Sequence, residues 1–373
     1  MKIALVHDYI RDFGGAERVL RSLSDLYPKA PIYTAFKVDG SPAAERFGDR
    51  HIYESKLAWL IRPWRLYSPL RFLLRWVWGS IDLSDYDLVV TSCSNYIARG
   101  FKAGRKTTVV AYCHTPPRFL YGYATAVDWK KHRPVRVYGN IISHFLRIFD
   151  YNSAMEVDHW IVNSENVRTR VEKFYRKSST VIYPPVNVTE IAKASRNVKR
   201  EEFYLITARI VGAKGLEEAV AAATKLRIPL KIAGGIAGYV SVKKRLEKIG
   251  GDNVEFLGRV TDENLWKLYG QAKGFIALAR DEDFGMTVVE AQAAGTPVIA
   301  FNGGGFRESV VHKKTGILVG DTDVKTLKKA FAEFEKTKWN RTAIKKHAKK
   351  FSKERFEKEM ISYMKTHARA TRG

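Results

Sequence analysis

The sequence predicts an α/β protein made of two doubly wound domains, each with a parallel sheet between layers of helices. The first observation behind this is length, because 373 residues exceed what a single hydrophobic core usually serves. The second is a rhythm in which short apolar runs precede segments of helical periodicity, which is typical of parallel strands joined by crossover helices. A hydrophobic content of 45% is ample for two cores.

The alternation of strands and helices starts with a strand at 3–7 and a helix at 15–26. Further strands of the first half are expected at 87–91, 108–114, 160–163 and 179–183, with a helix at 165–174. Strands of the second half are expected at 203–208, 230–233, 254–257, 274–279 and 298–300, with helices at 215–224, 240–249 and 262–272. The lysine-rich segment 325–367 is amphipathic, which predicts terminal helices that close the fold.

A hinge is expected near Tyr183–Arg200, where Pro184-Pro185 and a polar segment interrupt the pattern. We therefore predict domains at 1–185 and 186–350, with 351–373 as a helix that packs back on the first domain. In doubly wound sheets, ligands bind at the carboxyl ends of the strands. Two such domains are expected to face each other across a cleft.

The chain is strongly basic, with a formal charge of +25. Such a charge indicates an anionic partner, although a solvated lysine-rich surface would also produce it. The two cysteines form neither a disulfide framework nor a metal cluster, which fits a reducing cytoplasm. The start MKIALVHDYI reads as a strand and not a signal peptide, and no run of about 18 apolar residues occurs.

Two strand ends carry groups suited to a phosphate. Gly14 and Gly15 follow the first strand and precede a helix, whose N-terminal N–H groups could bind an anion. Arg209 and Lys214 follow the first strand of the second half, and two cations there suit a diphosphate. An ordinary tight turn and an ordinary basic surface are the respective alternatives.

Two other strand ends give weaker signals. His114 precedes Pro116-Pro117, where it could hydrogen-bond a hydroxyl or a phosphate, although a single histidine is more often structural. The segment GGGFRES at 303–309 is a second glycine-rich turn before a helix.

The stretch DEDFGMTVVEAQAAGTPVIA at 281–300 places Glu282 and Glu290 on either side of Phe284-Gly285. Both carboxylates could bracket one concave site that grips sugar hydroxyls. A capping box from Thr287 to Glu290 is the structural alternative, in which the Glu290 side chain accepts a hydrogen bond from the backbone N–H of Thr287.

These elements resemble the retaining glycosyltransferases of family 4, which have the GT-B fold. The resemblance rests on Glu282 and Glu290 with seven residues between them, AGTPVIA, the GG turn, GGAERV, the Arg209–Lys214 pair and the His114 loop, in that family's order. The segments LYPKAPIYTAF and YCHTPPRFLYG are most similar to bacterial mannosyltransferases that build O-antigen or exopolysaccharide. The loop IVGAKG departs from the family by lacking an acidic or proline residue before the lysine.

The resemblance implies a role for each matched position. Arg209 and Lys214 would bind the donor diphosphate, Glu282 the donor sugar and Glu290 the ribose. His114 would lie near the sugar, and Gly14 and Gly15 beside the diphosphate or the acceptor. The remaining donor-binding positions would be Phe284, Gly285, Met286 and Thr287 near the sugar, and Gly258, Arg259 and Val260 beside the base.

The resemblance also implies retention of anomeric configuration, no cofactor and no essential metal. GDP-mannose is the leading donor, and a UDP- or dTDP-linked sugar is the alternative. The expected acceptor is a saccharide on a polyprenyl diphosphate, so the protein would be cytoplasmic and peripheral on the inner face of the membrane.

The stretch SKLAWLIRPWRLYSPLRFLLRWVWGS at 55–80 combines five Lys or Arg with no acid and many aromatics, including Trp59, Trp64, Trp76 and Trp78. This composition suits contact with an anionic membrane surface, and a pair of core helices is the alternative. A nucleic-acid-binding protein is the rival from another class. Charge and aromatic content permit it, but no binding motif appears, so we expect no nucleic-acid partner.

Overall fold

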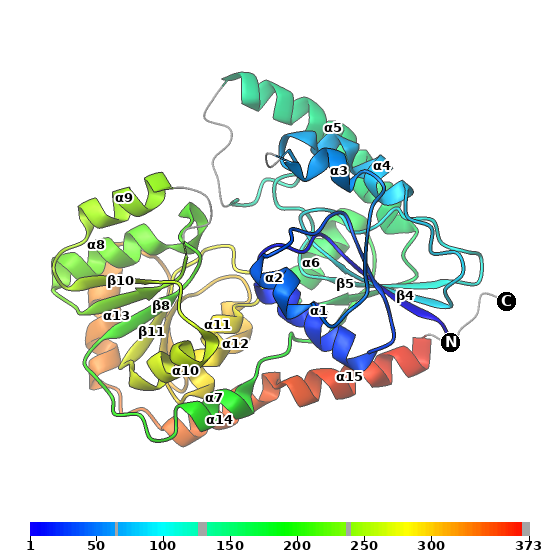
Figure 1. The fold of residues 1–373 in the computed structure, drawn as a ribbon. Coiled ribbons are helices and arrows are strands. Elements are labelled where there is room, and N and C mark those ends of the chain that lie inside the picture. The colour runs from blue at the N-terminus through cyan, green and yellow to red at the C-terminus, as the bar shows by residue number, and fades with distance from the viewer. Residues whose placement is uncertain (64–65, 126–132, 236–239, 368–373) are drawn as a thin grey trace. The chain divides into compact units, whose positions relative to one another are not determined.

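The computed structural model describes residues 1–63, 66–125, 133–235 and 240–367. Trp64 and residues 368–373 of the predicted terminal segment lie outside the described residues. The chain divides into two compact units (Figure 1). The first holds the described residues of 1–123, 133–185 and 354–367, and the second holds 124–125 and the described residues of 186–353.

The first unit is built on a seven-stranded parallel sheet in the order β3-β2-β1-β4-β5-β6-β7. The strands are β1 (Ile3–His7), β2 (Ile32–Thr34), β3 (Ile52–Glu54), β4 (Leu88–Cys93), β5 (Thr108–Cys113), β6 (His159–Val162) and β7 (Thr180–Val181). The chain extends the sheet from β1 to one side and then, from β4, to the other. The order therefore reverses between β1 and β4.

Helices cover both faces of this sheet, so its strands are apolar on both sides. Along β1, Ala4 and Val6 face one hydrophobic cluster and Leu5 faces another. The first cluster includes side chains of α3 (Ala58–Ile61), α4 (Leu74–Gly79), α5 (Arg133–Met155) and α6 (Glu165–Tyr175). The second includes side chains of α1 (Gly15–Leu26), α2 (Pro42–Arg46) and α15 (Lys353–His367).

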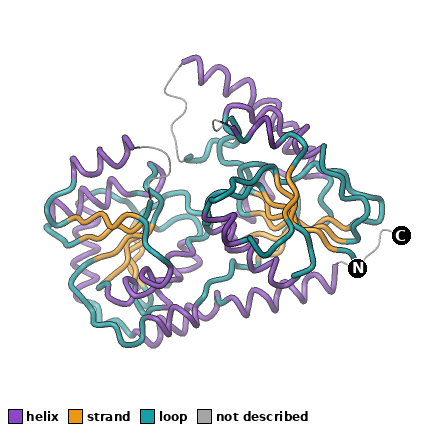
Figure 2. Tube along the Cα trace, in the orientation of Figure 1, coloured by secondary structure: helices purple, strands orange, loops and turns teal. Residues whose placement is uncertain are grey.

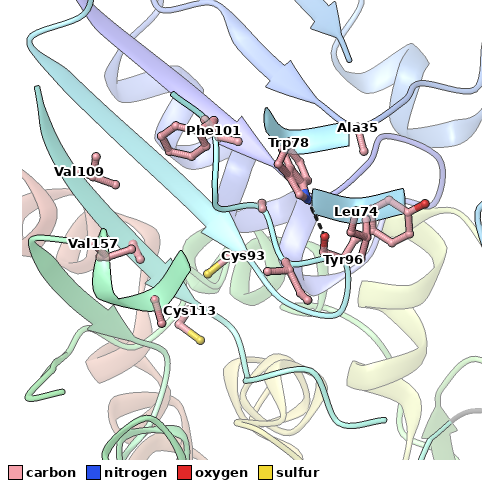
Figure 3. Packing of buried hydrophobic residues seen from close by; sticks show 14 of the residues in the cluster. Ala35, Leu74, Trp78, Cys93, Tyr96, Phe101, Val109, Cys113 and Val157 are labelled. Carbon is pink, nitrogen blue, oxygen red and sulfur yellow. Dashed lines mark hydrogen bonds between the residues drawn. The ribbon is translucent and has the colours of Figure 1, made fainter. Parts of the chain in front are cut away.

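Trp78 anchors the first of these clusters (Figure 3). Its ring is fully buried, and its Nε1–H donates a hydrogen bond of 2.8 Å to the carbonyl oxygen of Tyr96. Cys93 and Cys113 are register partners on β4 and β5 and are both buried in this cluster as free thiols. The two cysteines therefore pack as core residues.

The second unit has a six-stranded parallel sheet in the order β10-β9-β8-β11-β12-β13. The strands are β8 (Tyr204–Thr207), β9 (Leu230–Ala233), β10 (Val254–Gly258), β11 (Gly274–Ala277), β12 (Val298–Phe301) and β13 (Gly316–Val319). The order again reverses, here between β8 and β11. Figure 2 shows each sheet enclosed by helices. The prediction of two doubly wound α/β domains is confirmed.

Two groups of helices flank this sheet. One group is α8 (Leu216–Leu226), α9 (Val240–Ile249) and α13 (Val324–Lys336), which share a hydrophobic cluster with alternate strand residues. The other group is α7 (Val188–Ala194), α10 (Asp262–Gln271), α11 (Met286–Ala293), α12 (Phe306–Ser309) and α14 (Arg341–Ala348). Within it, α11 is central, because it packs against α7, α10, α12 and α14. The short turns η4 (Gly212–Lys214) and η5 (Lys349–Phe351) precede α8 and α15.

Candidate active site

In the second unit, the loops after β8 and β11 lie side by side at the carboxyl edge of the sheet, because these strands are neighbours. Arg209 and Lys214 belong to the first loop, and Glu282 belongs to the second. Lys214 Nζ donates a hydrogen bond of 2.7 Å to Glu282 Oε2. Two predicted site residues that are 68 positions apart in the sequence therefore form an ion pair.

This ion pair is open to solvent, with side chains 27% exposed for Lys214 and 19% for Glu282. Arg209 is exposed on the same loop as Lys214. An ion pair of this exposure contributes little to folding stability. A lysine has three donor hydrogens and a carboxylate has several acceptor sites, so the pair can bind an anionic group and a hydroxyl at the same time.

Gly215 fixes the position of Lys214. Its φ is +68°, and a Cβ at this position would lie 2.5 Å from the carbonyl oxygen of Leu278, just after β11. Such a conformation and such a close approach both require glycine. The loop that carries Lys214 is thereby held against the chain that leads to Glu282.

The glycine-rich turn 303–305 supports the loop that carries Glu282. A Cβ on Gly304 would lie 2.3 Å from the carbonyl oxygen of Glu282, and one on Gly305 would lie 2.3 Å from the Cα of Phe284. The N–H of Gly305 donates a hydrogen bond of 3.0 Å to the same carbonyl oxygen of Glu282. Close backbone packing therefore accounts for these glycines without a bound phosphate.

Glu290 is buried inside α11, where its Oε2 accepts a hydrogen bond of 2.7 Å from the hydroxyl of Tyr269. The capping-box alternative for Glu290 is wrong. Gly285, with φ +89°, is the residue before the helix, so α11 begins at Met286 and Thr287 lies inside it. A Cβ on Gly285 would lie 2.5 Å from the ring of Phe306. The start of α11 therefore packs closely against this ring, and only glycine leaves room for it.

The other predicted donor-binding residues of this unit also lie at or near the carboxyl edge. Phe284 is buried with its ring 5.3 Å from that of Phe351, and Met286 and Thr287 are half-buried in the first turn of α11. Gly258, Arg259 and Val260 come at the end of β10, which β9 separates from β8. Gly258 has a φ of +68°, and Arg259 is exposed.

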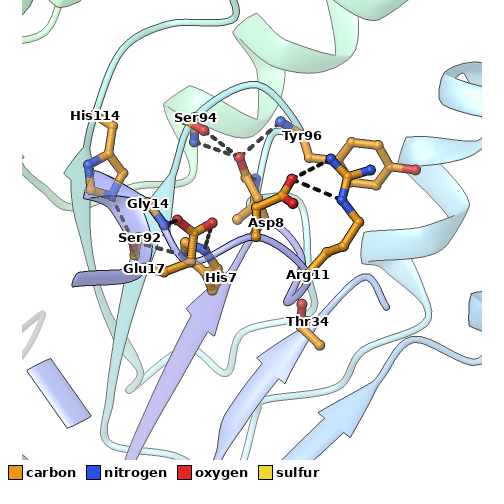
Figure 4. Close-up of polar contacts among 12 residues, drawn as sticks. His7, Asp8, Arg11, Gly14, Glu17, Thr34, Ser92, Ser94, Tyr96 and His114 are labelled. Atoms are coloured by element: carbon orange, nitrogen blue, oxygen red, sulfur yellow. Dashed lines mark hydrogen bonds and ion pairs between the residues drawn. The ribbon is translucent and has the colours of Figure 1, made fainter. Parts of the chain in front are cut away.

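In the first unit, a chain of polar side chains crosses the carboxyl edge between β1, β4 and β5 (Figure 4). Glu17 Oε1 lies 3.5 Å from His7 Nε2, and His7 Nδ1 lies 3.0 Å from the hydroxyl of Ser92. The same hydroxyl lies 2.8 Å from His114 Nε2. His114 is thus joined to α1 through residues from three neighbouring elements.

Gly14 takes part in this chain of contacts. Its N–H donates a hydrogen bond of 2.8 Å to Glu17 Oε2, and Gly15 begins α1. The N–H group that the sequence suggested for anion binding is therefore bound to a carboxylate of the protein. Sequence reasoning did not single out His7, Glu17 or Ser92. The available signal was that His7 ends β1 and that Glu17 follows the glycine pair.

His114 is buried, and its environment favours the neutral ring. Burial, and secondarily the neighbouring His7, lowers the pKa of His114 to about 3. Its carbonyl oxygen accepts a hydrogen bond of 2.9 Å from Asn163 Nδ2. The side chain can therefore serve as a neutral hydrogen-bonding group at physiological pH but not as a cation.

Asp8, directly after β1, shapes the loop that follows β4. Its carboxylate accepts hydrogen bonds from the N–H groups of Ser94, Tyr96 and Ala98, at 3.0 to 3.1 Å. It also accepts one of 2.6 Å from the Ser94 hydroxyl. A carboxylate with this many donors acts as a structural anchor for the loop.

Family models match both halves of the chain. The model "Glycosyltransferase Family 4" matches residues 13–190, and the model "Glycosyl transferases group 1" matches residues 187–351. The chain belongs to the family 4 glycosyltransferases. The expectation drawn from Glu282, Glu290 and the glycine-rich turns is thereby confirmed at the level of the family and of its GT-B fold.

Individual relatives are more distant. An uncharacterized glycosyltransferase of Methanocaldococcus jannaschii is 25% identical over 56% of this chain and 58% of its own length. A GDP-mannose-dependent alpha-(1-6)-phosphatidylinositol monomannoside mannosyltransferase of Mycobacterium tuberculosis is 33% identical over 40% of this chain and 42% of its own length. This glycosyltransferase therefore spans less than two thirds of the length of these curated relatives.

A solved structure of similar fold is that of Anabaena Alr3699/HepE in complex with UDP and glucose. Its TM-score is 0.68 at 17% identity, over 98% of this chain and all of that one. At this identity the likeness concerns the fold alone. Among the described residues, no helix has the length and hydropathy that crossing a membrane requires, and no group of three or more His, Cys, Asp or Glu is placed to hold a metal ion.

Proposed function

We propose that this protein is a retaining glycosyltransferase that moves a hexose from a nucleoside-diphosphate sugar to an acceptor hydroxyl. The observation that carries the proposal is the contact between Lys214 and Glu282 at the switch point of the second sheet. A nucleoside-diphosphate sugar has a diphosphate bonded directly to a sugar. The ion pair offers a cation and a carboxylate with the same adjacency, one for the phosphate oxygens and one for the hydroxyls.

The other residues extend this donor site. Arg209 shares the diphosphate with Lys214, while Glu282 and the backbone of 284–287 hold the sugar hydroxyls. Glu290 holds the ribose hydroxyls, since its position in α11 is fixed by the hydrogen bond from Tyr269. Gly258, Arg259 and Val260 lie beside the base at the end of β10.

The chemical step breaks the bond between the anomeric carbon and the diphosphate oxygen. The acceptor oxygen forms the new bond on the same face, and its proton passes to the departing phosphate. Negative charge grows on the diphosphate as the bond breaks. Arg209 and Lys214 stabilise this charge more in the transition state than in the ground state, which is the condition for a higher rate.

The donor is GDP-mannose in this proposal. Support comes from the Mycobacterium tuberculosis relative, which is GDP-mannose-dependent by name. The Anabaena structure of similar fold holds UDP and glucose, so a UDP-sugar is the alternative. The acceptor is a saccharide on a lipid diphosphate. In this proposal the neutral His114 lies near the sugar, and Gly14 and Gly15 lie beside the diphosphate or the acceptor.

A panel of nucleotide sugars tests the proposal. Thermal unfolding is followed with GDP-mannose, UDP-glucose, UDP-galactose, dTDP-rhamnose and no ligand, because a ligand that binds the folded state raises its stability. We expect GDP-mannose to give the largest shift and Lys214→Ala to abolish it. A native protein that no nucleotide sugar stabilises or donates from would overturn the proposal, and a preference for a UDP-sugar would replace only the donor.

A further inference from the structure

Helix α5 presents an unusual surface. It carries eight of the sixteen exposed large hydrophobic side chains among the described residues. Its inner side packs in the core through Leu146 and Ala154. Its outer side carries Val137, Ile141, Phe145 and Ile148 at spacings of four, four and three residues, so these form one stripe along the helix.

The charges on this helix are almost all positive. Arg133, Arg136 and Arg147 are exposed. The only acid of α5 is Asp150, which is fully buried and ion-paired with the buried Arg99. The outer side of α5 is therefore both apolar and cationic, with no acidic group of the helix to offset it.

Helices α3 and α4 lie on the same side of the first unit as α5 and add exposed aromatic side chains to it (Figure 1). The 3-10 turn η2 (Pro69–Leu73) packs against both α4 and α5, and Tyr138 of α5 donates a hydrogen bond to the carbonyl oxygen of Pro69. The core-helix alternative for stretch 55–80 holds for part of it. Trp78 is core, whereas Trp59 and Trp76 are 67% and 58% exposed.

We infer that the outer side of α5, with the exposed indoles of α3 and α4, is a docking surface for an anionic phospholipid membrane. An interfacial helix inserts its apolar stripe at the headgroup boundary while its arginines meet lipid phosphates. Tryptophan is favoured at this depth, because its ring is apolar and its N–H is polar. We name this set the α5 surface: Val137, Ile141, Phe145, Ile148, Trp59 and Trp76.

Charge complementarity selects this occupant over a second copy of the chain. In a symmetric dimer, the same patch meets itself, so the arginines of both copies would face each other across a dehydrated contact. An anionic membrane instead supplies the opposite charge over the whole surface. The inference deepens the proposed function, since a lipid-linked acceptor resides in a membrane, but it rests on the first unit alone.

Site-specific fluorescence tests the surface directly. Both native cysteines are buried, so Phe145→Cys can be labelled selectively with an environment-sensitive dye. Ile361→Cys on α15 is the matched control, because Ile361 is also exposed, at 39%, and lies outside the α5 surface. We expect a blue shift at 145, and none at 361, on addition of vesicles of phosphatidylcholine with phosphatidylglycerol. No shift at 145, or equal shifts at both sites, would overturn the inference.

Vesicle flotation supplies the second measurement. We expect the double variant Ile141→Gln/Phe145→Gln to bind these vesicles at least about ten-fold less than native protein, and Arg136→Gln about five-fold less. Ile361→Gln should bind as native protein does. Dimers in vesicle-free solution that dissociate in the double variant would overturn the membrane occupant in favour of a second copy.

Donor-induced thermal stabilisation is measured on the same variants. A native protein that GDP-mannose stabilises but that ignores vesicles overturns only the α5 surface. A protein that binds vesicles but no nucleotide sugar overturns only the proposed function.

Discussion

The carboxyl edges of the two sheets share a topology and differ in chemistry. Both strand orders reverse beside the first strand of the unit, and both reversals are marked by polar side chains. In the second unit the pair is a partly exposed lysine and glutamate, while in the first it is a buried chain through His7, Ser92 and His114. The second edge is suited to a charged ligand, and the first to positioning a neutral hydroxyl.

The largest expected effect concerns the ion pair at the carboxyl edge of the second sheet. Lys214→Ala should lower the transfer rate by roughly 100- to 1,000-fold, because it removes a cation that stabilises charge on the leaving diphosphate. Steady-state rates with the preferred donor measure this. Lys273→Ala is the control, since Lys273 forms a similar ion pair with Glu202 at 2.6 Å but precedes β11, at the opposite end of the strand that leads to Glu282. Equal losses in both variants would contradict the assignment.

The second expected effect is a dependence of folding stability on pH that is caused by the buried His114 of the first unit. Folded His114 binds a proton only near its lowered pKa of about 3, whereas the unfolded chain binds one near 6.5. Between these values the unfolded state holds more protons, so stability falls as pH is lowered. From pH 7 to pH 5, the free energy of unfolding should fall by about 2 kcal/mol more in native protein than in His114→Gln. Denaturant titrations measure it, and the exposed His51→Gln should follow native protein.

A smaller effect is expected where the two histidines meet. Ser92→Ala removes the hydroxyl between His7 and His114 and should lower the transfer rate about ten-fold, the scale of a lost neutral hydrogen bond. Donor-induced thermal stabilisation should stay unchanged, because Lys214 and Glu282, the ion pair proposed to bind the donor, belong to the second unit. Ser153→Ala, another buried serine of the first unit, is the control. A loss of donor stabilisation in Ser92→Ala would contradict the separation of roles.

The smallest effect concerns metal removal. In the proposed mechanism, Arg209 and Lys214 stabilise the negative charge on the departing diphosphate, and no metal ion is needed for this. EDTA should therefore change the transfer rate by less than about two-fold. The assay is run with and without added Mg²⁺ or Mn²⁺. Loss of activity in EDTA that Mg²⁺ restores would show that a cation shares this task.

Some elements were predictable residue by residue. The ranges expected for β1, α1, β9 and α9 coincide with those observed, because each has a clear apolar period and a turn residue at its boundary. The short strands β2, β3 and β13 and the helix α5 were not predicted. The strands β2 and β3 have three residues each, too few to show an apolar period, and α5 is apolar on two sides, which obscures the single-face period.

The residues of the candidate active site likewise divide into those that the sequence suggested and those that it did not. Glu282 and Lys214 were suggested by local glycine and charge patterns, and the structure brings them into contact. His7 and Ser92 carry no local pattern, since they are 85 residues apart and meet only because β1 and β4 are neighbours. Sequence therefore identifies residues in distinctive loops better than residues whose importance arises from strand order.

The position of α15 has a consequence for biosynthesis. Phe356, Met360 and Met364 of this helix complete the hydrophobic cluster that also contains Leu5 of β1 and Val19 of α1. A ribosome makes the whole second unit before it makes these residues. Translation proceeds at about 5–20 residues per second. One face of the first sheet therefore stays incompletely covered for several seconds or more, until α15 has been made. The first unit can thus complete its core only after the whole second unit has been made, although its own synthesis begins first.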